Sequence, residues 1–119
     1  MTTMSEAAGR ASASQRRFDR HAVDIRITAH VFRSGNIVSL WGRSTELGED
    51  GVGGTLTCEL EPGEVVRMEL ALPLAATPMK LRAVVRYRQG LHHGFEFLAL
   101  TGAQRDMLHR VCEMLSANA

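Results

Sequence analysis

The chain has 119 residues, of which 45% are hydrophobic and 23% charged, and its 14 Lys and Arg residues against 13 Asp and Glu give a formal net charge of +1. This composition is typical of one globular domain, which at this size buries roughly two-thirds of its unfolded surface and needs no disulfide or structural metal. The near-neutral charge argues against binding to polymeric nucleic acid, and no apolar run approaches the roughly 20 residues of a membrane helix.

The first fourteen residues differ in character from the rest of the chain. They are rich in Ala, Ser, Thr and Gly and have too few large apolar side chains to offset the entropy of ordering, so we expect a flexible tail over residues 1–14 and a single domain over residues 15–117. Met1–Ser14 also lacks the basic start and apolar centre of a signal peptide, which favours a cytoplasmic location. In that reducing compartment we expect Cys58 and Cys112 to be free thiols in the core.

Alternation of apolar and polar residues predicts a series of short strands. These strands cover residues 22–32, 37–47, 52–58, 65–72, 79–88 and 95–100. The C-terminal segment has helical periodicity instead, and Thr101 followed by Gln104 fits a capping box at the start of that helix. The fold class is therefore all-β with a C-terminal helix, and we predict a six-stranded antiparallel β-barrel with the helix packed over one end.

The sequence offers little for catalysis. It lacks the motifs Gly-x-Ser-x-Gly, Gly-Lys-Ser/Thr, Cys-x-x-Cys and His-Glu-x-x-His. His92 and His93 are adjacent, but neighbours on a strand point to opposite faces, so we expect no metal site there. The carboxylates of Glu46, Glu49 and Asp50 allow acid–base work or a solvated turn, and the turn is favoured. We therefore expect no enzyme activity, no catalytic residue, no metal and no cofactor.

Two further features of the second and third strands have alternative interpretations. Four closely spaced glycines, at positions 48, 51, 53 and 54, are followed by a strand instead of a helix, so the helix-terminus mechanism of phosphate binding is absent. They indicate a left-handed backbone, a bulge or close approach by a ligand. Trp41, the single tryptophan, is expected in the core or over the barrel end, with a stacking surface for a base or a partner as the alternative.

A cationic cluster of Arg16, Arg17 and Arg20 precedes the first strand. Guanidinium groups form paired hydrogen bonds with phosphate oxygens or with the O6/N7 edge of guanine, and they stack on flat bases. Such a run is usually a solvated basic junction when it stands alone. Its place directly before the first strand also suits a clamp for an anionic nucleotide.

Two sequence elements together resemble the PilZ domain family. Arg16-x-x-x-Arg20 is followed by an alternating strand and then by Glu46-Leu-Gly48-Glu-Asp-Gly51, whereas the family pairs Arg-x-x-x-Arg with Asp/Asn-x-Ser-x-x-Gly. The likeness covers residues 15–117 and includes the segment from Gly94 to Phe97, which looks like the family's closing Gly-x-x-Phe pattern. The resemblance implies a six-stranded barrel with a C-terminal helix that acts as a bacterial receptor for the signalling nucleotide cyclic di-GMP.

The resemblance also implies which residues bind the ligand. They are Arg16, Arg17, Arg20, Glu46, Gly48 and Gly51. Arg16 and Arg20 would hold the phosphates and guanine faces, with Arg17 as an auxiliary contact. Glu46 replaces the family's Asp or Asn and keeps an acceptor for guanine N1 and N2, whereas Gly48 replaces Ser and has no hydroxyl. The two changes together cost on the order of 2 to 4 kcal/mol, which weakens binding by ten- to a thousandfold.

Three hypotheses follow for the function. The first is a bacterial cyclic di-GMP-binding receptor or adaptor, in which the arginine segment closes over the nucleotide and the domain signals to a downstream protein partner. The alternative, favoured by Glu46 and Gly48, is a PilZ-like protein-interaction module that does not bind the nucleotide. A small RNA- or DNA-binding barrel is disfavoured by the net charge and by the 5% aromatic content.

Overall fold

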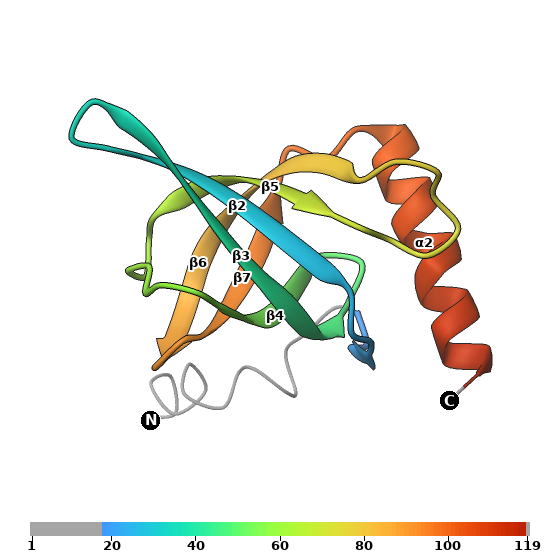
Figure 1. Ribbon diagram of the computed structural model, residues 1–119. Helices are drawn as coiled ribbons and strands as arrows, with labels where there is room; N and C mark the ends of the chain where they lie inside the picture. Colours follow the sequence, from blue (N-terminus) through green and yellow to red (C-terminus); the bar gives the residue numbers. More distant parts are fainter. Residues whose placement is uncertain (1–17, 119) are drawn as a thin grey trace, which may run out of the picture.

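Six antiparallel strands form a closed ring in the computed structural model, which describes residues 18–118 (Figure 1). The elements are β1 (His21–Ala22), β2 (Arg26–Arg33), β3 (Asn36–Leu47), β4 (Gly51–Leu56), β5 (Val65–Leu70), β6 (Met79–Gln89), β7 (His92–Leu98) and the helix α2 (Gly102–Ala117). The pairing runs β3–β2–β5–β6–β7–β4, and β4 pairs again with β3 to close the barrel. The predicted six-stranded barrel with a C-terminal helix is therefore confirmed.

The N-terminal end of the barrel differs from the expected first strand, which was to cover residues 22–32. The regular pairing of β2 begins at Arg26, and the two residues of β1 pair separately with the end of β3. Ser44 lies between these pairings: its hydroxyl accepts a hydrogen bond from the Ile25 amide at 3.0 Å and donates one to the Val23 carbonyl. The Ser44 side chain therefore adds to the backbone hydrogen bonds that join residues 23–25 to β3, and on the other edge of β3 the pairing with β4 shifts register between Ser44 and Glu46.

The core is built from the inward-facing residues of every barrel strand. Ile27 on β2, Met68 and Leu70 on β5, and Phe95 on β7 are almost completely buried, and burial of each such side chain is worth about 1.5–3 kcal/mol. Helix α2 adds three buried side chains, Leu108, Val111 and Cys112. The capping box predicted at Thr101 and Gln104 is present, so the start of the helix is fixed by local hydrogen bonds.

Two predictions about the core are wrong. Trp41 lies on the outside of β3 with 55% of its surface exposed, because Leu40 and Gly42 occupy the inward positions on either side of it. Only glycine fits at position 42, where a Cβ atom would lie 1.9 Å from the Thr55 carbonyl oxygen. Cys58 is also exposed, since β4 ends at Leu56 before reaching it.

The expected core position of Cys112 is confirmed, and burial raises the pKa of its thiol to about 11. A thiol with this pKa carries almost no thiolate at neutral pH, so Cys112 acts as a small apolar core residue. Within residues 18–118, no helix has both the length and the apolar character needed to span a membrane. The expected flexible tail, Met1–Ser14, lies outside the described residues, as do Arg16 and Arg17.

Candidate functional site

The backbone pairing of β1 brings Arg20 next to the turn between β3 and β4. His21 pairs with Leu47, so Arg20, one residue earlier, lies beside Gly48, one residue later. A Cβ atom on Gly48 would lie 2.8 Å from Arg20 Cδ and 3.0 Å from its Nε. The arginine side chain therefore occupies the space into which a side chain at position 48 would project.

Two carboxylates surround the end of this arginine. Arg20 Nη1 lies 3.6 Å from Glu46 Oε2, and Nη2 lies 3.6 Å from Asp50 Oδ1. Both distances are longer than the 2.7–3.2 Å of a good hydrogen bond, so these contacts are ion pairs without strong hydrogen bonding. The arginine side chain is only 15% exposed, and its Nε and Asp50 Oδ1 are buried without a hydrogen-bond partner among residues 18–118. Much of the hydrogen-bonding capacity of Arg20 is therefore unused in this arrangement.

Glycines form the backbone surface next to Arg20, on the outer face of β4 and β7. The Glu46 side chain lies over Gly53, 3.3 Å from the position of a Cβ there, and the Tyr87 ring occupies the place of a Cβ on Gly94. Gly53 and Gly94 are directly paired in the β4–β7 ladder. The side chains of Glu46 and Tyr87 thus lie directly over the glycine backbone of β4 and β7.

Helix α2 contacts the same turn through His109. Its Nδ1 lies 3.0 Å from Glu49 Oε2, and its Nε2 lies 3.3 Å from Glu113. The hydrogen bond with Glu49, supported by the charge of Glu113, raises the pKa of His109. A hollow of about 350 Å³ adjoins the turn between Phe18, Asp50 and the start of α2. The turn that contacts Arg20 is therefore also tied to the helix.

The structure brings together four of the six residues named by the sequence. Arg20, Glu46, Gly48 and Gly51 form one cluster, in which a Cβ on Gly51 would lie 3.1 Å from Arg20 Nη2. Arg16 and Arg17 lie outside the described residues. Asp50 was missed as a member of this site, although the acidic cluster of the sequence had included it.

The acidic cluster lies at the partly exposed turn between β3 and β4, and its carboxylates have partners there. Glu46 and Asp50 pair with Arg20, and Glu49 pairs with His109. The glycines of this region also lack the left-handed backbone that was one of their interpretations, since the positive φ values of glycine in residues 18–118 fall at positions 35, 63 and 90. Their role is to allow close approach, by Arg20 and by neighbouring strands.

Histidines and carboxylates do not form a metal centre in the described part of the chain, where no group of three His, Cys, Asp or Glu side chains could hold an ion. His93 is fully buried while His92 lies on the opposite, outer face. The His93 Nδ1–H donates to the Leu91 carbonyl at 2.7 Å, and Nε2 accepts from the Leu60 amide at 2.9 Å. His93 is thus a satisfied core histidine, and burial lowers its pKa.

These features define a class of small closed β-barrel in which an arginine before the first strand meets a glycine-containing acidic turn. The sequence profile of the PilZ domain matches residues 14–114, and the chain belongs to this family. A search of curated proteins finds no match to the sequence.

Solved structures with the same fold have low sequence identity to this chain. The PilZ domain with c-di-GMP of YcgR from Escherichia coli is 16% identical with a TM-score of 0.70, and the match covers 88% of this chain and 94% of that one. YcgR from the same organism in complex with c-di-GMP is 21% identical with a TM-score of 0.70, covering 87% and 47%. The Bacillus subtilis inhibitor of motility, MotI/DgrA, is 16% identical with a TM-score of 0.69, covering 87% and 52%. The chain thus spans about half the length of the two longer proteins.

Proposed function

We propose that this bacterial PilZ domain is a receptor for cyclic di-GMP in the cytoplasm, and that its arginine segment closes over the nucleotide to signal to a partner protein. The observation that carries the proposal is the meeting of the two motif elements: Arg20 lies on Gly48, with its guanidinium 3.6 Å from Glu46. The YcgR structures that share the fold contain this nucleotide, which supports the choice of ligand.

The chemistry of the cluster suits a nucleotide with phosphates and guanine bases. A phosphate offers Arg20 two oxygens for charge-assisted hydrogen bonds, which are stronger than its present ion pairs at 3.6 Å. The Glu46 carboxylate next to Arg20 has the acceptor oxygens that guanine N1 and N2 require. The glycine surface of β4 and β7 admits a flat base close to the backbone. Arg16 and Arg17 supply further cationic donors. No step of this mechanism requires catalysis.

The same contacts oppose binding to some degree, because the ligand has to compete for Arg20. Asp50 adds a negative charge next to the proposed phosphate position, and Gly48 provides no hydroxyl. These features favour the alternative function, a PilZ-like protein-interaction module that does not bind the nucleotide. The two functions differ in one measurable property, the affinity for cyclic di-GMP.

Isothermal titration of the full chain with cyclic di-GMP tests the proposal, with GTP as the specificity control. We expect saturable binding that Arg20→Ala weakens at least about tenfold, since it removes charge-assisted hydrogen bonds worth about 1.5–3 kcal/mol. Arg26→Ala is the matched control: this arginine is exposed on β2, forms no ion pair within residues 18–118, and should leave the affinity unchanged. Absence of heat at high ligand concentration, or full affinity in Arg20→Ala, would overturn the receptor function.

A further inference from the structure

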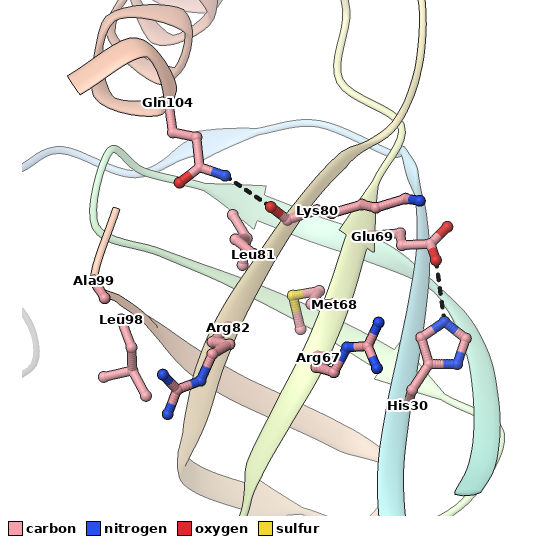
Figure 2. A pocket seen from close by; sticks show the side chains of 10 residues that line it. All are labelled: His30, Arg67, Met68, Glu69, Lys80, Leu81, Arg82, Leu98, Ala99 and Gln104. Atoms are coloured by element: carbon pink, nitrogen blue, oxygen red, sulfur yellow. Dashed lines mark hydrogen bonds and ion pairs between the residues drawn. The ribbon is translucent and has the colours of Figure 1, made fainter. Parts of the chain in front are cut away.

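A second site lies on the outer face of β2, β5 and β6, and it shares no residue with the arginine cluster. A groove of about 320 Å³ is lined there by the cationic side chains of Arg67, Lys80 and Arg82, and it extends to Gln104 at the start of α2 (Figure 2). Gln104 Nε2 donates a hydrogen bond to the Lys80 carbonyl at 2.7 Å, which joins the helix to this edge of the groove.

The charges in this groove are unbalanced. Arg67 and Arg82 are direct partners in the β5–β6 ladder, and like charges opposite each other destabilise a sheet. Neither they nor Lys80 form an ion pair or a side-chain hydrogen bond within residues 18–118. The one carboxylate in the groove, Glu69, is instead bound to His30 Nε2 at 3.1 Å (Figure 2).

Elsewhere in the described chain, cationic side chains are mostly neutralised by neighbours. Five arginines have carboxylate partners: Arg20, Arg33, Arg43, Arg86 and Arg88. The Arg and Lys side chains without an ion pair in residues 18–118 are Arg26, Arg67, Lys80, Arg82, Arg105 and Arg110, and three of these, Arg67, Lys80 and Arg82, lie together in this groove. The pairing of Arg67 with Arg82 lowers the stability of the sheet, and no contact within residues 18–118 compensates for it. This arrangement therefore indicates an anionic partner outside the chain.

Exposed apolar side chains form a row next to the groove on the same face. Phe32 on β2 pairs with Ile37 on β3, and these side chains are 73% and 61% exposed. Val65 on β5 is 49% exposed. In the antiparallel β2–β5 ladder His30 pairs with Arg67, so Phe32, two residues after His30, lies on the same side of this pair as Val65, two residues before Arg67. Because side chains alternate between faces, the apolar row and the basic row run side by side across three strands. The β2–β3 hairpin that carries Phe32 and Ile37 projects beyond the other strands (Figure 1).

We propose that the outer face of β2, β3, β5 and β6 is a docking surface for an acidic, apolar-containing segment of a partner protein. Carboxylates of the partner would lie between Arg67 and Arg82, and its apolar side chains would cover Phe32, Ile37 and Val65. Complementary charge sets the register, while burial of the apolar row supplies the hydrophobic contribution. This inference does not depend on nucleotide binding.

Charge complementarity favours a partner protein over two other occupants. The N-terminal segment of this chain, residues 1–17, has three arginines and a single acidic residue, so it would be repelled by the groove. A second copy of the chain offers few free carboxylates, since within residues 18–118 all except Asp19 and Asp106 already have an Arg or His partner.

Selection from a random peptide library displayed on phage, with the immobilised full chain as bait, tests this docking surface. We expect enriched peptides that combine Asp or Glu with apolar residues. A synthetic version of such a peptide should bind the full chain less tightly as the salt concentration increases. The affinity of this peptide should fall at least about tenfold when the chain carries Arg82→Glu or Phe32→Ser. Arg26→Glu is the control: it makes the same change of charge outside the groove and should change the affinity less than about twofold.

Arg82→Glu separates a binding defect from unfolding. It places opposite charges in the β5–β6 pair, so its melting temperature should equal that of the wild type or exceed it by about 2–4 °C. Selected peptides without acidic residues, no enrichment at all, or undiminished affinity for Arg82→Glu would overturn the proposal. Displacement of the peptide by equimolar inorganic pyrophosphate would overturn it too, because it would identify a small-anion site.

Discussion

Restoring a serine at position 48 is predicted to strengthen nucleotide binding. The new Cβ would lie 2.8 Å from Arg20 Cδ, whereas ordinary contact begins at 3.4 Å, so the arginine side chain must move by at least about 0.6 Å. The backbone itself tolerates the change, because Gly48 is not among the glycines with positive φ, although the Asp19 carbonyl at 3.1 Å must shift by a few tenths of an ångström. Such a shift changes the position of the guanidinium relative to Glu46 and Asp50.

The expected gain in affinity for cyclic di-GMP has two contributions, the added hydroxyl and the displacement of Arg20, and two variants separate them. In Gly48→Ser, a hydroxyl that reaches the ligand adds about 1–3 kcal/mol, which corresponds to roughly a five- to 150-fold tighter dissociation constant for cyclic di-GMP. Gly48→Ala carries the same Cβ without the hydroxyl, so it reports only the release of Arg20. Isothermal titration of both variants beside the wild type measures the two parts.

One result would refute this reasoning about Arg20. If Gly48→Ser binds cyclic di-GMP no more tightly than the wild type while unfolding at the same urea concentration, neither the missing hydroxyl nor the position of Arg20 limits affinity. A weaker affinity in Gly48→Ala than in the wild type would show, in addition, that the resting contact of Arg20 with Gly48 is the binding geometry itself.

Two further predictions concern stability. The folded-state pKa of His93 is lowered, so its stabilising contribution is complete above the unfolded value of 6.5 and is lost as the pH falls through the folded pKa. The variant His93→Gln keeps a hydrogen-bond acceptor for the Leu60 amide but does not titrate. In thermal melts it should therefore lose less stability between pH 7 and 5 than the wild type. Gly94→Ala should cost about 1–3 kcal/mol in urea unfolding, since its Cβ would lie 2.0 Å from the Tyr87 ring, and Tyr87→Ala should relieve part of that cost; additive losses would contradict the clash.

The sequence was sufficient to predict the fold because its signals are local. Alternation of apolar residues marks strands such as β2 and β5, and Thr101 with Gln104 marks the helix start through a hydrogen-bond pattern that spans three residues. Local signals failed where pairing was decided elsewhere. The two residues of β1 are too few to show a period, and the outward position of Trp41 follows from the β2–β3 register, in which Gly42 pairs with the buried Ile27.

The candidate site was predictable in part for the same reason. Arg20, Glu46, Gly48 and Gly51 belong to two short motifs whose spacing is visible in the sequence, whereas Asp50 gains its role only from its position 3.6 Å from Arg20. No motif pointed to the basic groove, since Arg67 and Arg82 are fifteen positions apart in the sequence and meet only through the β5–β6 register.

The sequence by itself determined the barrel class, the helix and the candidate arginine clamp, because each depends on residue type and short-range spacing. The tertiary structure alone decided which charges are neutralised and which remain free. An ion pair depends on the distance between side chains from different strands, and strand register sets that distance. Register results from the packing of the whole core, so the resting contacts of Arg20 and the unpaired charge of Arg67 and Arg82 are properties of the folded barrel.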